Sequence, residues 1–123
     1  GAIVVQVPLL DMKRYSHLLA GASWMAEYGD PDTADWSFIQ TFSPYHLFDA
    51  NKDYPATLFT TSTKDDRVHP GHARKMMAMM EAAGKDVRYY ENIEGGHGGA
   101  ANNAQSAHMN ALAYTFLWQQ LAK

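Results

Sequence analysis

The sequence contains no cysteine among its 123 residues, which excludes disulfide bonds, a thiol nucleophile and thiolate metal ligands. It also lacks an excess of positive charge, since ten Lys and Arg stand against thirteen Asp and Glu, for a formal net charge of −3. That balance argues against a nucleic-acid partner, because binding a phosphate backbone requires clustered basic residues. No apolar run approaches the roughly 18 residues that span a bilayer, and no segment has the pattern of a signal peptide. We therefore expect no nucleic-acid partner and no membrane partner.

The residues that are present are typical of a globular domain, with 46% apolar and 19% charged. The length fits one domain, and no linker, repeat or low-complexity tract divides residues 1–123. The chain opens directly on the apolar, β-branched run Ala2–Val7. Such a run is typical of a strand inside a sheet rather than of a terminus at the surface. We therefore expect this chain to be a piece of a larger protein.

Three β-branched or apolar runs predict strands that are separated by helical segments. Strands that alternate with helices pair in parallel, through right-handed crossovers. The sequence therefore predicts an α/β fold with about three parallel strands and flanking helices. The predicted strands are Ala2–Val7, Ala56–Thr61 and Asp86–Ile93.

The helical segments differ in how clearly they are marked. Leu9–Leu19 has mixed helical spacing, and a short helix further on is expected to end before Pro44. A longer helix is predicted over residues 70–84, where a proline stands in the first turn and a glycine follows the last. The final helix is expected to be capped by Asn102 or Asn103.

Acid–base chemistry is predicted at the carboxyl ends of the second and third strands, where open α/β sheets place their sites. The loop Thr63–Pro70 carries Asp65, and the glycine-rich loop Glu94–Gly99 carries His97. Adjacent parallel strands lie about 5 Å apart, so these loops can bring the carboxylate within hydrogen-bond reach of the imidazole. A carboxylate-oriented imidazole is half of a hydrolase triad. Two alternatives stay open: Asp66 could face the imidazole instead, or the glycines could form a plain flexible loop with an exposed histidine.

Five motifs extend this interpretation when they are taken together and in order. They are Leu9-Leu10-Asp11-Met12, Gly21–Gly29 with its Gly-Ala-Ser-Trp start, Ser43-Pro44-Tyr45-His46, Lys64–His72 and Glu94–Gly98. The combined pattern covers essentially the whole chain and resembles the prolyl oligopeptidase family, most closely its bacterial branch. Members of that family are serine peptidases with an α/β-hydrolase domain that is closed by a β-propeller. The resemblance implies that residues 1–123 are the C-terminal portion of such a catalytic domain, without an internal boundary and with an incomplete sheet.

The resemblance also implies roles for individual residues. Asp65 would be the triad acid and His97 the triad base. Four residues would bind a peptide substrate: Trp24, Tyr28, Arg67 and Val68. Of these, the tryptophan would stack on the substrate proline, the tyrosine and the valine would line the same pocket, and the arginine would bind a backbone carbonyl.

Simpler interpretations of these residues stay beside the resemblance. Trp24 could be an ordinary core aromatic, and Arg67 could pair at the surface with Asp66 or Glu94. We expect no cofactor and no metal. The histidines three residues apart at positions 69 and 72 could share a metal with Asp65, but the proline and glycine between them leave the start of the helix uncertain.

The nucleophile of the triad is missing, because none of the six serines lies in a Gly-x-Ser-x-Gly elbow. In the family, the elbow strand comes immediately before the strand that matches Ala2–Val7. We therefore expect a serine peptidase as the intact protein and no activity from this chain alone. A related acylaminoacyl peptidase or esterase is an alternative. So is an inactive assembly module that pairs through the edge of Ala2–Val7, with the rest of the domain or with another copy. The resemblance leaves the compartment open between the cytoplasm and the periplasm.

Overall fold

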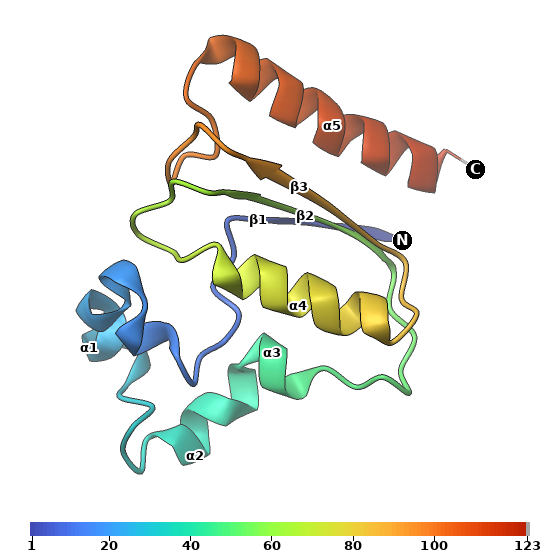
Figure 1. Cartoon of the computed structure of the whole chain (residues 1–123). Coiled ribbons are helices and arrows are strands. Elements are labelled where there is room, and N and C mark those ends of the chain that lie inside the picture. Colours follow the sequence, from blue (N-terminus) through green and yellow to red (C-terminus); the bar gives the residue numbers. More distant parts are fainter. Residues whose placement is uncertain (123) are drawn as a thin grey trace.

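The computed structural model describes residues 1–122 as a three-stranded parallel sheet with helices on both faces (Figure 1). The strands β1 (Ala2–Gln6), β2 (Ala56–Ser62) and β3 (Val87–Asn92) lie in that order across the sheet. Ala2 pairs with Ala56 and Thr57 pairs with Val87. The predicted α/β class with parallel strands is confirmed.

Strand β2 lies between β1 and β3 and is the most buried strand of the sheet. Six of its seven residues are buried, in agreement with the sequence pattern. Strand β1 is less buried than β2, since Ile3 is 40% exposed. The reason is positional: within residues 1–122, β1 pairs only with β2, and its other edge is open.

The two long helices cover opposite faces of the sheet (Figure 1). Helix α4 (Gly71–Ala82) starts directly after Pro70, and Gly84 just beyond its end has a φ of +74°, a left-handed conformation that glycine adopts without strain. Helix α5 (Asn103–Leu121) is capped by Asn102, whose side chain accepts a hydrogen bond of 2.9 Å from the amide of Gln105. Both helices were predicted.

The connection from β1 to β2 contains only short helical segments. The segments are the 3₁₀ helices Tyr15–His17, Leu19–Trp24 and Gln40–Phe42, and the single-turn helices α1 (Met25–Tyr28), α2 (Trp36–Ile39) and α3 (Pro44–Leu47). The mixed helical spacing of Leu9–Leu19 corresponds only to the 3₁₀ turn Tyr15–His17, and the chain turns sharply at Leu19, which has a φ of +51°. Pro44 starts α3 in addition to ending the segment before it, since proline suits the first position of a helix.

Two apolar clusters hold these parts together. Under α4, Leu10, Phe59 and Met80 form a core against the sheet. In the connection, Met12, Tyr15 and Ile39 form a second core, against which Trp24 and Trp36 pack. Each fully buried side chain of this kind contributes about 1.5–3 kcal/mol to the stability. The sheet and the connection therefore each have a core of their own.

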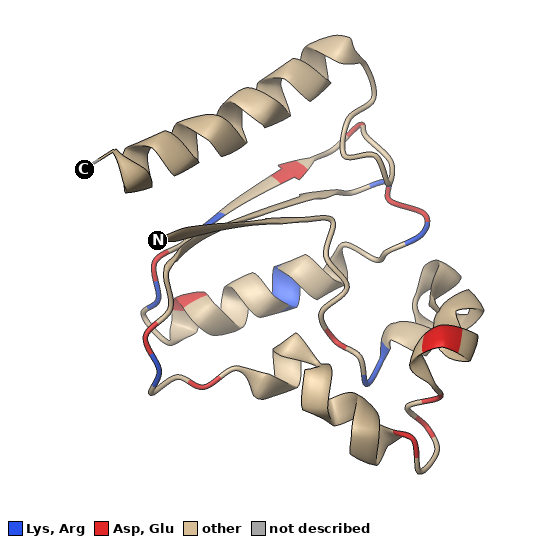
Figure 2. Cartoon of the chain, turned by 180° about the vertical axis from the view of Figure 1, so that it is seen from behind, with Lys and Arg blue, Asp and Glu red and all other residues tan. Residues whose placement is uncertain are grey.

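Helix α5 differs from the rest of the chain in its lack of charged side chains (Figure 2). Helix α5 carries no Lys, Arg, Asp or Glu, and its Trp118 is 74% exposed. Even so, none of the helices within residues 1–122 combines the length and the apolar character needed to cross a membrane.

Candidate active site

The loops after β2 and β3 meet at one edge of the sheet and bring Asp65 to His97. The imidazole Nδ1 lies 3.1 Å from Oδ2 and 3.2 Å from Oδ1 of the carboxylate. The side chain of Asp65 is fully buried, whereas that of His97 is 36% exposed. The pair therefore combines a shielded carboxylate with an imidazole that solvent or a substrate can reach.

Backbone amides fix the orientation of this carboxylate. Oδ1 of Asp65 accepts hydrogen bonds from the amides of Arg67, at 2.9 Å, and Val68, at 3.0 Å. Asp66 is exposed and makes no such contact with His97. The structure thus brings Asp65, and not Asp66, to His97.

A buried asparagine that the sequence analysis overlooked shapes the loop of His97. The Asn92 side chain accepts from the amide of Gly95 at 3.0 Å and donates to Oε1 of Gln105 on α5 at 2.8 Å. Gly95 lies so close to the returning chain that a Cβ there would sit 2.9 Å from the backbone of Ala100. The loop is therefore tied to β3 and α5 rather than freely flexible, which disfavours the alternative of a plain flexible loop.

Three of the four predicted substrate-binding residues lie around one cavity. Trp24, Tyr28 and Val68, together with Leu9 and Glu27, line a space of about 240 Å³. The tryptophan also packs against the core of the connection, so the interpretation as a core aromatic is correct in part.

Arg67 is the predicted residue that the structure does not bring to this cavity. It is exposed, and its carbonyl accepts a hydrogen bond of 3.2 Å from the amide of Ala20. The structure does not pair it with Asp66 or with Glu94, although all three residues are described. The alternative interpretation, in which Arg67 forms a surface ion pair with Asp66 or Glu94, was therefore wrong.

The two histidines near Asp65 each contact the backbone. Nδ1 of His69 accepts from the amide of Gly71 at 2.8 Å, and Nδ1 of His72 accepts from the amide of Asp11 at 2.9 Å. No cluster of three or more potential metal-binding side chains occurs in residues 1–122. Asp65, the carboxylate that could have completed a metal site with these histidines, contacts His97.

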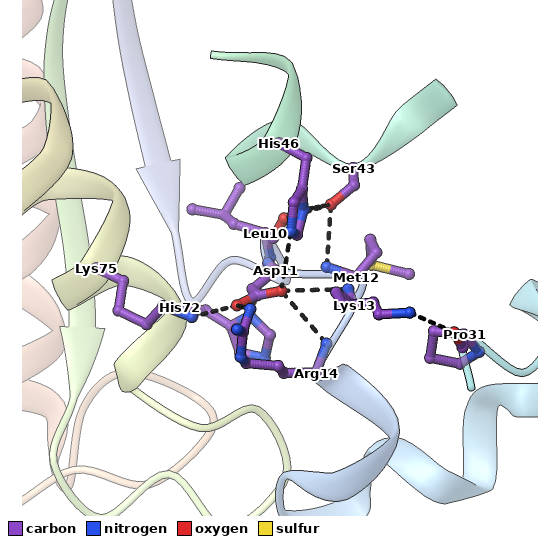
Figure 3. A network of polar contacts seen from close by, with 10 residues as sticks. All are labelled: Leu10, Asp11, Met12, Lys13, Arg14, Pro31, Ser43, His46, His72 and Lys75. Carbon is purple, nitrogen blue, oxygen red and sulfur yellow. Dashed lines mark hydrogen bonds and ion pairs between the residues drawn. The ribbon is translucent and has the colours of Figure 1, made fainter. Parts of the chain in front are cut away.

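A buried carboxylate at Asp11 organises the polar interior between β1 and the helices (Figure 3). The side chain of Asp11 is 1% exposed and forms ion pairs with Lys75 of α4 and, at 3.2 Å, with Arg14. Nε2 of His46 lies 4.0 Å away. The Asp11 network, as we call it, consists of Asp11, Arg14, Ser43, His46, His72 and Lys75. Asp11, Ser43, His46 and His72 lie within the motifs described above, but Arg14 and Lys75 do not, and no pattern in the sequence indicated that the six residues meet.

Electrostatics in this network follow from burial and charge. Burial acts to raise the pKa of Asp11, but the hydrogen bond and charge of Lys75, with Arg14 and His46, outweigh it and keep the pKa below the usual range. Burial lowers the pKa of His72 to about 4. The aspartate is therefore charged and the buried histidine neutral at physiological pH.

A second cavity adjoins the loop of His97 at the end of β1. Val7, Thr60 and Gly98 are among the residues around this space of about 240 Å³. Val7 has a φ of +40°, which is strained for a β-branched residue. The cavity thus lies between the open edge of the sheet and the imidazole loop.

Comparisons with known proteins show what this chain is similar to. A model described as the prolyl oligopeptidase family matches residues 1–123. An uncharacterized peptidase of Sinorhizobium fredii is 53% identical over 121 residues, which is 98% of this chain and 17% of that protein. This chain therefore spans about a sixth of the length of that curated relative.

Two solved structures share the fold. A structure from a study of two prolyl endopeptidases is 39% identical with a TM-score of 0.90, over 99% of this chain and 19% of that one. A post-proline cleaving enzyme from Rickettsia typhi is 35% identical with a TM-score of 0.89, over 99% of this chain and 18% of that one.

Proposed function

Because this chain belongs to the prolyl oligopeptidase family, we propose that the intact protein is a serine peptidase that cleaves after proline. Residues 1–123 would be the C-terminal portion of its catalytic domain, without an internal boundary. The observation that carries this proposal is the contact between the buried carboxylate of Asp65 and Nδ1 of His97 at the carboxyl end of the sheet. Two of the three members of a triad would thus come from this chain.

In this mechanism, His97 acts as general base and then as general acid. Its Nδ1 donates to Asp65, which fixes the tautomer and leaves Nε2 to take the proton of a serine hydroxyl. The serine attacks the carbonyl carbon of the scissile bond, and the imidazolium then protonates the leaving amine. Water hydrolyses the acyl-enzyme by the same proton transfers in reverse order. Asp65 stays ionised and stabilises the imidazolium.

The attacking serine would come from a part of the protein outside this chain. None of the six serines stands in an elbow pattern, and two of them, Ser16 and Ser62, have buried hydroxyls without a hydrogen-bond partner among residues 1–122. The open edge of β1, with Ile3 exposed, is a site for pairing with a further strand. The cavity beside Val7 adjoins both that edge and the loop of His97. We therefore assign the edge to the remainder of the same catalytic domain, and expect this chain alone to be inactive.

Selectivity for proline would come from the cavity around Trp24. The indole, the Tyr28 ring and Val68 present a mostly apolar surface, and about 240 Å³ is enough for a pyrrolidine ring. Arg67 lies in the same turn as Val68 and is exposed, so its guanidinium can bind a substrate carbonyl in front of the cavity. The two solved structures described above come from enzymes that are named for cleavage at proline.

The test is an assay of the full-length protein on a matched pair of blocked p-nitroanilides, Gly-Pro and Gly-Ala. We expect turnover that an organophosphate serine reagent abolishes, with kcat/KM at least tenfold higher for the proline substrate. Hydrolysis of acylated amino acids or simple esters without a preference for proline would identify a sister hydrolase instead. Turnover that the serine reagent leaves intact would contradict the mechanism itself.

A further inference from the structure

The cavity around Trp24 is formed by two segments that are distant in the chain. Leu9, Trp24 and Tyr28 come from the connection that follows β1, whereas Val68 comes from the loop between β2 and α4. One direct backbone hydrogen bond of 3.2 Å joins the two segments, from Ala20 to Arg67. The width of the cavity therefore depends on what else holds the connection against α4.

His72 makes the first of these links. It lies in the first turn of α4, four residues after Val68, and is 2% exposed. Its Nδ1 accepts hydrogen bonds from the amides of Leu10, at 3.3 Å, and Asp11, at 2.9 Å. This acceptor fixes the backbone next to Leu9 relative to the start of α4.

The carboxylate of Asp11 makes the second link. It forms an ion pair with Lys75, one turn further along α4, and Oδ1 accepts from the amides of Lys13 and Arg14 at 3.2 and 3.3 Å. The next residue, Tyr15, packs edge-on against the ring of Tyr28, with 5.9 Å between the centroids. A continuous series of contacts therefore runs from α4 to the aromatic wall of the cavity.

We propose that Asp11, His72 and Lys75 position the aromatic wall of Trp24 and Tyr28 against Val68, and thereby set the selectivity for proline. The proposal rests on the proposed function and deepens it. None of the three side chains lines the cavity, so they act through the backbone of residues 9–15. They are positioning residues and not catalytic residues.

Substitutions at His72 separate this role from simple packing. In His72→Asn the amide oxygen stands close to the place of Nδ1 and keeps an acceptor for the amides of Leu10 and Asp11. In His72→Leu a similar volume remains, but both buried amides lose their acceptor and the backbone must move to satisfy them. We therefore expect His72→Asn to keep the selectivity for proline that His72→Leu loses.

The experiment measures kcat/KM of the full-length protein on the Gly-Pro and Gly-Ala p-nitroanilides. We expect His72→Leu to lower the proline-to-alanine ratio at least fivefold, mainly through a higher KM for the proline substrate, and His72→Asn to keep it within twofold of the wild type. A merely structural role would lower activity on both substrates alike and leave the ratio unchanged. An unchanged ratio in a folded His72→Leu protein overturns the proposal.

A second pair of variants covers the case in which His72→Leu does not fold. Lys75 is 37% exposed, so Lys75→Met removes the charge facing Asp11 with little loss of packing, and Lys75→Arg restores it. We expect the first to lower the proline-to-alanine ratio and the second to keep it, and equal ratios in the two overturn the proposal. If the wild type shows no preference for proline at all, the proposed function has failed; if it shows the preference and no variant alters it, only the positioning role has failed.

Discussion

The two halves of the candidate site are held by different means. Asp65 and His97 follow directly on regular strands, and backbone amides at 2.9 and 3.0 Å fix the carboxylate. The aromatic wall of Trp24 and Tyr28 instead lies on a connection of single turns. That connection has a small apolar core and is held to α4 by the buried charge of Asp11.

Under the proposed function, this difference would separate the residues of the catalytic chemistry from those that determine selectivity for proline. Acid–base chemistry needs fixed geometry, and the ends of packed strands supply it. The wall of a specificity pocket can be exchanged without disturbing the sheet, provided that the polar contacts behind it are kept. Those contacts are sensitive, because the carboxylate of Asp11 is 1% exposed, and removing a charged partner leaves that buried charge less well compensated. Variants of the two halves should therefore fail in different ways.

The largest effect is expected at the sheet. In the full-length protein, His97→Gln should lower kcat on the proline substrate by about 10³-fold or more, because the serine loses its base. The proline-to-alanine ratio of the residual activity should stay close to that of the wild type. His108→Gln, the same change at an exposed histidine of α5, serves as the control and should leave kcat unchanged. Wild-type kcat in His97→Gln would rule out the imidazole as the base.

A second effect is expected on the free energy of unfolding, which should depend on pH through His72 in the Asp11 network. The buried His72, which faces Asp11, Lys75 and His69, has its pKa lowered from 6.5 to about 4. Between these values the unfolded chain binds more protons than the folded one, so the free energy of unfolding falls as the pH falls. The loss amounts to about 3 kcal/mol by pH 4 and is absent above pH 6.5. Thermal unfolding of the full-length protein at pH 7 and pH 5 measures the first part of this loss, about 2 kcal/mol.

The control for the pH effect is His72→Asn, which carries no titratable group at this position. Its midpoint of unfolding should start lower than that of the wild type at pH 7 and fall less between pH 7 and pH 5. Parallel pH dependence of the two proteins would show that His72 titrates as an ordinary exposed histidine.

The smallest effect is expected at the wall itself. Trp24→Ala removes a face on which a proline ring would stack, and should lower kcat/KM for the proline substrate about tenfold while leaving the alanine substrate within twofold. Trp36→Ala is the matched control, because Trp36 packs against the same core but does not line the cavity. Equal losses of selectivity in both variants would assign the effect to the core and not to the cavity.

The difference between the sheet and the connection also explains which features could be predicted from the sequence. The strands β2 and β3 and the helices α4 and α5 were predicted closely, because Ala56–Thr61 is continuously apolar or β-branched and Asn102 is a strong cap. The approach of the loop of Asp65 to that of His97 followed from parallel pairing, whereas the choice of Asp65 over Asp66 came from the family resemblance. These features depend on local patterns and on one rule of sheet geometry.

The connection could not be predicted in the same way. Its turns depend on close tertiary contacts, such as Gly21, where a Cβ would lie 1.7 Å from the carbonyl oxygen of Tyr15. The role of Asp11 depends on Lys75 and His72, which lie more than sixty residues away in the chain. No periodicity in the sequence encodes such a pairing.

The register of the sheet also implies an order of folding. Ala2 pairs with Ala56, 54 residues further on, whereas Thr57 pairs with Val87, only 30 residues further on. Closing the longer loop costs about 0.5 kcal/mol more in chain entropy, and it also requires the whole irregular connection to become ordered. The unit from β2 to β3 should therefore assemble before β1 joins it. Asp65 and His97 would then meet early, and the wall around Trp24 would be the last part of the site to form.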